Sequence, residues 1–361
     1  MRRIVSLLVV TALLLCGCSR LGKPEQKQYT ATFLTLFDTV TTILGHAESE
    51  EAFAETVQKI HDDLEIYHRL FDIYHDYEGI NNLKTINDQA GIAPVQVDQA
   101  IIDLLIDCRA YYEQTSGRVN VAMGSVLELW HVARNRGISD PANAALPKMG
   151  ELEAAAEHIR FEDILIDEAA STVYIPDPEM SLDVGAIAKG WATQRVAENA
   201  PAGMLISVGG NVCATGPKQG EHPWVIGIQN PNGGDYLHTI YVESGCVVTS
   251  GDYQRTYTVE GKQYHHIIDP DTLMPAAYWR SVSIVCQDSA LADIGAVHLE
   301  PAFVVGAHTQ EEPETGLGQG IELLPGIGFQ VAVLGVHQYI CLTQQRRDGF
   351  LPAAQIVLQL F

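Results

Sequence analysis

The order of helix-like and strand-like segments is the feature that most constrains the fold of this chain. Between Glu50 and about Tyr74, apolar residues recur every three or four positions and predict one amphipathic helix: Phe53, Val57, Ile60, Leu64, Tyr67 and Phe71. A second such helix is expected over 98–117, whereas the stretch 78–91 has the composition of a loop. From Ile164 onward, short alternating segments separated by tight turns predict strands. Helices grouped first and strands grouped later predict an α+β fold with a mostly antiparallel sheet and flanking helices.

The composition excludes several classes of partner. The chain has 361 residues, 47% hydrophobic and 19% charged, which suits a globular protein with a large core or two lobes. Its formal net charge of -23 argues against a nucleic-acid partner and against electrostatic attachment to an anionic membrane. An anionic ligand would therefore need a local device, such as a metal ion, a lysine or a helix N-terminus.

The N-terminus has the layout of a secretory signal. In residues 1–17 a basic start precedes an apolar run that is too short to span a membrane comfortably. The run ends in "LLCGC", which resembles a bacterial lipoprotein signal and would make Cys18 the lipidated first residue. The alternative is an ordinary cleaved signal peptide. Residues 18–29 are then a polar tether, and 30–361 form the main domain.

The cysteines beyond the signal are widely spread and include no CxxC pair. The sequence therefore suggests neither a zinc site nor a disulfide framework. Most lie in apolar surroundings and are expected to be small core residues: Cys108, Cys213, Cys246, Cys286 and Cys341.

The stretch "SLDVGAIAKGWATQ", 181–194, places a carboxylate, two glycines and a lysine at the expected start of a helix near Gly185. A glycine there would let a ligand approach the backbone, and the helix N-terminus would favour a phosphate. Asp183 suits either an N-cap or a ligand contact, because both roles take the same residue type at the same place.

Four further motifs follow this stretch in order: "ISVGGN", "HPWVIGIQNP", "TSGDYQR" and "HHIIDPDT". Together with "DVGAIAKGW" they resemble the ApbE family of bacterial flavin transferases, from about Thr30 to Asp293. The stretch "YHRLFDIYHDYEGINNLKTIND" resembles the lipoprotein branch of that family. The resemblance implies an ApbE-like fold with an FAD cleft between two lobes.

The resemblance also implies a reaction. Such proteins use Mg²⁺ to cleave the pyrophosphate of FAD, and they move the FMN half onto a threonine or serine of a target flavoprotein while AMP leaves. The target is expected to be a subunit of a membrane redox complex. The enzyme is expected to be lipid-anchored on the extracytoplasmic face of the bacterial cell membrane, where it would modify this target. Two alternatives stay open: an FAD pyrophosphatase that yields FMN and AMP, and an inactive FAD-binding lipoprotein.

Residue roles follow from the resemblance, motif by motif. His266 is the expected general base or leaving-group residue, with a turn-bonded strand-end histidine as the alternative. Asp183 and Lys189 would contact the nucleotide, and Asp183 is expected to be catalytic as well. The Ala186 carbonyl and Asp293 would hold Mg²⁺. Further cofactor contacts are expected from Phe37, Gly209, Gly210, Asn211, Ser250, Tyr253 and Ile267. The motif "TSGDYQR", 249–255, is expected to line the cleft. On sequence alone, Phe37 suits a core position equally well, and Tyr253 could stack on a ring or simply pack.

The chain departs from the family pattern in its last part. Where the family has Asp-x-x-x-Thr, Asp293 is followed by Val297, which lacks the oxygen that Mg²⁺ prefers. Leu273 replaces a glycine in "DPDTLMP", where a positive φ would be strained. Residues 294–361 largely lose the resemblance and are either diverged or displaced by a frameshift just after Asp293. A Ser-Thr pair in another reading frame of the gene would establish the frameshift.

Overall fold

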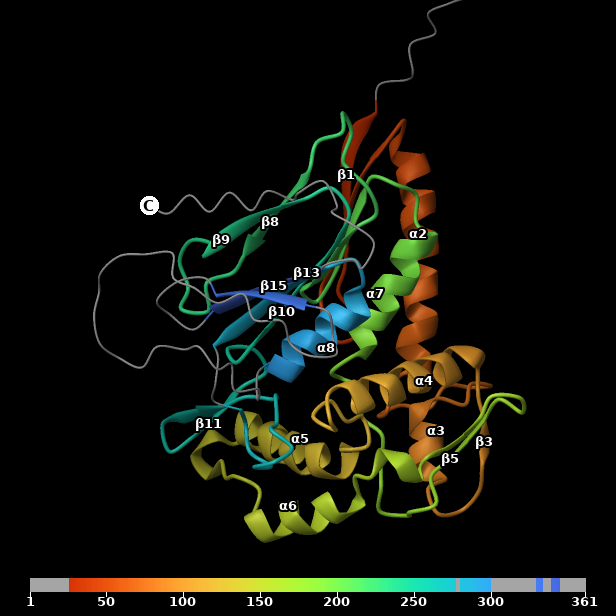
Figure 1. The fold of residues 1–361 in the computed structure, drawn as a ribbon, viewed down its shortest axis with the longest axis vertical. Helices are drawn as coiled ribbons and strands as arrows, with labels where there is room; N and C mark the ends of the chain where they lie inside the picture. The colour runs from red at the N-terminus through yellow and green to blue at the C-terminus, as the bar shows by residue number, and fades with distance from the viewer. Residues whose placement is uncertain (1–25, 277–279, 300–328, 334–338, 345–361) are drawn as a thin grey trace, which may run out of the picture.

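The computed structural model of the protein describes residues 26–276, 280–299, 329–333 and 339–344. Its centre is an eight-stranded sheet (Figure 1). In spatial order the strands are β1 (Lys27–Phe33), β2 (Thr41–Ala47), β6 (Met204–Val208), β7 (Asn211–Ala214), β10 (Gly245–Gly251), β13 (Ser281–Cys286), β15 (Tyr339–Gln344) and β14 (Phe329–Val333). Neighbours are antiparallel except β13 and β15, which run parallel. The α+β class with a mostly antiparallel sheet is confirmed.

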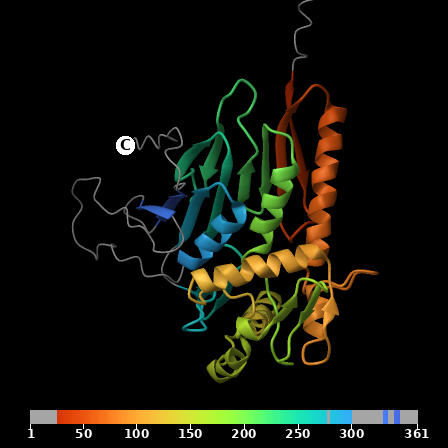
Figure 2. The same ribbon diagram turned by 45° about the vertical axis from the view of Figure 1, so that its right-hand side comes forward.

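Helices cover one face of this sheet and a hairpin covers the other (Figures 1 and 2). The helices are α2 (Glu50–Leu70), α7 (Ala188–Asn199) and α8 (Ser289–Leu299), and the hairpin pairs β8 (Trp224–Ile228) with β9 (His238–Val242). Side chains alternate across a strand, so Ile206 of β6 packs with the helices while Leu205 packs with the hairpin. We call this part the sheet lobe.

The apolar stripe predicted between Glu50 and Tyr74 is confirmed as α2, although the helix ends at Leu70. It begins after Ser49, whose side chain accepts a hydrogen bond from the backbone N–H of Ala52. Four stripe residues are buried within the helix: Phe53, Val57, Ile60 and Leu64.

The remaining elements form the helical lobe, below the sheet in Figure 1. Its helices are α3 (Leu83–Asp88), α4 (Gln99–Gln114), α5 (Gly124–Ser139) and α6 (Met149–Ala155). Its strands are β3 (Val95–Gln96), β4 (Leu165–Asp167), β5 (Thr172–Tyr174), β11 (Tyr257–Val259) and β12 (Lys262–Tyr264). The helix predicted over 98–117 is confirmed as α4, which buries Ile101, Ile102, Leu104 and Leu105.

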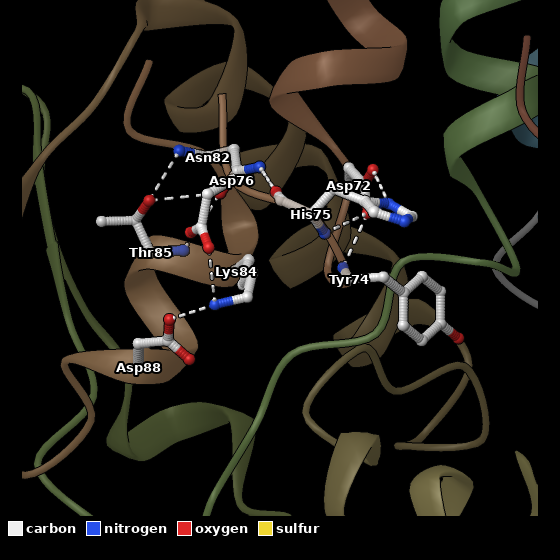
Figure 3. Close-up of polar contacts among 8 residues, drawn as sticks. All are labelled: Asp72, Tyr74, His75, Asp76, Asn82, Lys84, Thr85 and Asp88. Carbon is white, nitrogen blue, oxygen red and sulfur yellow. Dashed lines mark hydrogen bonds and ion pairs between the residues drawn. The ribbon is translucent and has the colours of Figure 1, made fainter. Parts of the chain in front are cut away.

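The prediction of a loop over 78–91 is wrong, because this stretch contains α3 (Figure 3). Asn82 and Thr85 form a capping box, in which each side chain accepts a hydrogen bond from the backbone N–H of the other. Lys84 adds ion pairs to Asp76 and Asp88. Polar residues that suggested a loop therefore define the start of a short helix.

The expectation that the sequence holds no disulfide is also wrong. Cys213 of β7 and Cys246 of β10 are register partners and are joined by a disulfide across 33 residues of chain. Sequence spacing gave no signal for the pair, because antiparallel pairing of the two strands brings the residues together. Cys108 and Cys286 are free and buried, as expected for core residues.

The signal 1–17 and Cys18 lie outside the described residues, and β1 already begins at Lys27, within the expected tether. None of the helices in the described part of the chain is long and apolar enough to cross a membrane.

Candidate active site

A polar cavity of about 250 Å³ lies between residues of the sheet lobe and the segments that flank β11 and β12. Half of its lining consists of residues singled out from the sequence: Lys189, Gly209, Asn211, Ser250, His266 and Asp293. Four more come from the motif "TSGDYQR", which was expected to line the cleft: Thr249, Gly251, Gln254 and Arg255. The two remaining lining residues, Asp38 and Thr39, were missed, although they follow Phe37 directly.

Asp293 of α8 brings a buried carboxylate to this cavity, only 3% exposed. Its Oδ2 atom accepts hydrogen bonds from the backbone N–H of Gly190 and from Nδ2 of Asn211, both at 3.0 Å. The Lys189 ammonium lies 3.9 Å from the same oxygen. A buried charge needs such partners, and here they come from α7 and β7.

Gly190 has a structural reason to be glycine. A Cβ atom at this position would lie 2.6 Å from Cβ of Asp293 and 2.6 Å from the carbonyl oxygen of Ser289, so a side chain would push α7 and α8 apart. The N–H of Gly190 is directed at Asp293 and not at the carbonyl of Ala186, four residues earlier. The Ala186 carbonyl is therefore not used as a helical acceptor by Gly190.

The glycine pair after β6 makes the tight turn that delivers Asn211. Gly209 and Gly210 have φ values of 56° and 98°, which side-chain-bearing residues rarely adopt. A Cβ atom on Gly209 would also lie 2.6 Å from the hydroxyl oxygen of Thr39. The motif "VGGN" thus brings the backbone of this hairpin against the loop before β2.

The two adjacent histidines have different environments. His265 is engaged by the backbone: its Nε2 lies 2.6 Å from the Ala276 carbonyl, and its Nδ1 accepts from the N–H of Ile267. The Nδ1 atom of His266 is buried and has no hydrogen-bond partner among the described residues. Burial, reinforced by the positive charges of Arg255 and Lys189, lowers the pKa of His266 to about 3. His266 is therefore a neutral imidazole at ordinary pH, which favours the base role over a standing imidazolium.

The interpretation of Asp183 as an N-cap is wrong. The helix α7 begins at Ala188, and Gly185 precedes it instead of forming its first turn. Asp183 is buried, and its Oδ1 accepts from the N–H of Gly185 at 2.8 Å, which closes a turn before the helix. Its Oδ2 lies 3.9 Å from Nε2 of His131.

Comparison with known proteins agrees with this geometry. The model of the ApbE family matches residues 37–310. This chain belongs to the ApbE family. Among curated relatives, the FAD:protein FMN transferase of Treponema pallidum is 34% identical over 62% of this chain and 65% of its own length. That of Klebsiella pneumoniae is 28% identical over 63% of this chain and 72% of its own.

Solved structures of the ApbE family have the same fold. The ApbE protein of Thermotoga maritima superposes with a TM-score of 0.68 at 30% identity, covering 76% of this chain and 87% of that one. The flavin transferase ApbE of Vibrio cholerae gives 0.62 at 22% identity, which supports the fold alone. The family match continues past Asp293 to residue 310, further than the motifs predicted.

Six residues predicted for ApbE-type site roles do not line the cavity: Phe37, Asp183, Ala186, Gly210, Tyr253 and Ile267. Phe37 packs against both large core clusters, with its ring edge-on to His68. The Tyr253 ring lies close over Gly251, and Ile267 is buried. Their roles in binding remain predictions.

Both departures from the ApbE pattern can be located. Leu273 has the positive φ, 59°, that a glycine would adopt more readily, and its carbonyl accepts from the indole N–H of Trp130 at 3.0 Å. Val297 lies in α8, but its side chain is outside the described residues, as are most of 300–361.

Proposed function

We propose that this protein is an Mg²⁺-dependent FAD:protein FMN transferase that releases AMP. The observation that carries the proposal is that a neutral, buried histidine, whose Nδ1 atom has no hydrogen-bond partner among the described residues, lines the same cavity as a lysine and a buried carboxylate. Attack at a pyrophosphate phosphorus meets an already anionic centre, so positioning and charge neutralisation matter most. The cavity supplies these in a chain of net charge -23.

His266 is the base in this scheme. Its neutral imidazole takes the proton of the acceptor threonine or serine hydroxyl as that oxygen bonds to the FMN phosphorus. The bond from this phosphorus to the bridging oxygen then breaks, and AMP leaves with the electron pair. Arg255 and Lys189 disfavour a lasting imidazolium, so the proton passes on to the AMP phosphate.

The residues present fit a hard cation. Asp293 offers a carboxylate, and the Ala186 carbonyl is not taken by Gly190, so both can provide the oxygen ligands that Mg²⁺ prefers. When bound there, the ion would supply neutralisation of pyrophosphate charge. Lys189 and the N–H of Gly190 orient the Asp293 carboxylate for that task.

The proposed location is the extracytoplasmic face of the bacterial membrane, through a lipid on Cys18, with a redox-complex subunit as acceptor. The disulfide between Cys213 and Cys246 supports an oxidising compartment. The rest of this assignment depends on the resemblance to the lipoprotein branch.

Incubation with FAD, Mg²⁺ and a target flavoprotein domain should leave acid-stable fluorescence on the target. Absence of label while FAD is demonstrably bound would contradict transfer. Chromatography separates the alternatives. Free FMN and AMP, with no gain of bound flavin when acceptor is added, would identify a pyrophosphatase, and unchanged FAD would identify an inactive binding protein.

A further inference from the structure

A second polar group lies outside the cavity lining and is not part of the scheme above. Tyr74 lies in the loop after α2, His131 on α5, and Asp183 before α7. The Tyr74 hydroxyl is 2.9 Å from Nδ1 of His131, and Nε2 of His131 is 3.9 Å from Oδ2 of Asp183. One imidazole therefore connects three segments that lie far apart in the sequence.

The loop that carries Tyr74 is itself held in place (Figure 3). Asp72 is 9% exposed and accepts hydrogen bonds from the N–H groups of Tyr74 and His75, from the Tyr77 hydroxyl, and pairs with the ring of His75. Although burial alone would raise it, these bonds hold the pKa of Asp72 below its ordinary value. The Tyr74 ring points away from this anchor and is 55% exposed.

A single neutral tautomer of His131 suits both neighbours. With the proton on Nε2, the N–H faces the Asp183 carboxylate 3.9 Å away, and Nδ1 accepts a hydrogen bond from the Tyr74 hydroxyl. Burial, with Arg134 and Arg255 nearby, lowers the pKa of His131 despite the opposing charges of Asp183 and Glu128. Burial and the charge of Asp183 raise the pKa of Tyr74 to about 12, so its hydroxyl remains a donor.

We propose that His131 is a positioning residue for the nucleotide. Its ring couples the Asp183 carboxylate to the Tyr74 hydroxyl, and so fixes a half-exposed aromatic ring where a flat ring of FAD can pack on it. Arg255, a cavity-lining residue, lies near both His131 and Tyr74. This inference rests on the proposed function, because it takes FAD as the ligand.

The test is the Kd for FAD, measured by flavin fluorescence without Mg²⁺, in a double-mutant cycle. We expect His131→Leu and Tyr74→Phe each to raise Kd by about five- to ten-fold, the range of one lost hydrogen bond. The double variant should bind no more weakly than either single variant. His131→Gln, which keeps a donor and an acceptor, should stay within about two-fold of the parent. His158→Gln, at a surface pair with Asp177 and Glu179, is the control and should bind as the parent does.

Two outcomes would overturn the inference: effects of the single variants that multiply in the double variant, or a parent-like Kd for Tyr74→Phe. The latter variant removes one oxygen from a half-exposed ring, so it keeps the test valid if His131→Leu does not fold. A parent that binds FAD without turning it over would contradict the proposed function, but the Kd values of the double-mutant cycle could still be measured and would still test the role of His131. A parent that binds no FAD would contradict both.

Discussion

The carboxylate of Asp293 accepts a hydrogen bond from the backbone N–H of Gly190, 103 residues earlier in the chain. This contact joins α8 to α7 at the cavity and turns one N–H of α7 toward a side chain. The same oxygen also accepts a hydrogen bond from Nδ2 of Asn211. The absence of a side chain at residue 190 is therefore part of how the carboxylate is positioned.

Gly190→Ala should damage both stability and turnover. The added Cβ would lie 2.6 Å from Asp293 Cβ and from the Ser289 carbonyl oxygen, so the helices must separate. We expect a loss of about 1–3 kcal/mol in the free energy of unfolding, the usual range for overpacking. Urea unfolding measures the loss, and FAD turnover of the folded variant measures the effect on the site. Gly150→Ala is the matched control, because no atom lies within 4 Å of its added Cβ. Equal stability of the Gly190→Ala protein and the parent would contradict the close packing of residue 190 against Asp293 and Ser289.

His266→Gln should make stability less sensitive to acid. The pKa of His266 is about 3 in the fold and ordinary, near 6.5, in the unfolded chain, so between these values only the unfolded chain binds this proton. The parent thus loses up to about 1.4 kcal/mol per pH unit through this group as pH falls from 6.5 toward 3. Urea unfolding at several pH values should show a shallower loss in the variant.

His158→Gln is the matched control for that experiment. The hydrogen bond to Asp177 raises the pKa of His158, so its protonated form stabilises the fold below the ordinary pKa, and this contribution is lost as pH rises through the raised value. Its removal should therefore lower stability by a constant amount below the ordinary pKa and leave the slope of the acid loss there unchanged. Identical pH dependence of the parent and the His266→Gln protein would show that His266 is not buried as a neutral group.

Replacement of Cys213 and Cys246 by alanine should lower the free energy of unfolding by about 3–4 kcal/mol, as expected for a closed loop of this length. The cross-link restricts the unfolded chain and holds β7 against β10. Reductant should destabilise the parent and leave the double variant unchanged. A parent that is insensitive to reductant, with both thiols reactive after unfolding without reductant, would show that the bond does not form.

Val297→Thr should lower the Mg²⁺ concentration needed for FAD turnover, whereas Asp293→Ala should abolish turnover. Val297 comes four residues after Asp293 in the α8 sequence, where the resemblance expects a hydroxyl ligand. One neutral ligand corresponds to roughly ten-fold in metal affinity. Turnover measured against Mg²⁺ concentration gives the comparison. The same metal dependence with valine and with threonine would mean that residue 297 does not face the ion.

Local patterns predicted the large elements because burial depends on periodicity. The stripe of Phe53, Val57, Ile60 and Leu64 became the buried face of α2, and the "GG" pair became the β6–β7 turn. The helix α3 was missed because its signal is a capping box within a polar stretch and not an apolar stripe.

Contacts between distant segments could not be predicted from local patterns. The spacing of Cys213 and Cys246 carries no information until β7 and β10 pair, and Asp38 and Thr39 become cavity residues only through the loop packed on Gly209. The family motifs did identify the cavity lining apart from Asp38 and Thr39, since they mark residues that meet in space. They did not reveal that His266 is neutral, which depends on burial and on Arg255.

The most direct test of the account is the intact mass of a purified acceptor domain after incubation with this protein, FAD and Mg²⁺. We predict a mass gain of one FMN less one water, with one AMP released per modified acceptor. His266→Gln and Asp293→Ala should each remove the gain, and His158→Gln should retain it. An unmodified acceptor with the parent enzyme while AMP accumulates would contradict transfer and establish hydrolysis. Full modification by His266→Gln would contradict the role of His266 as the base.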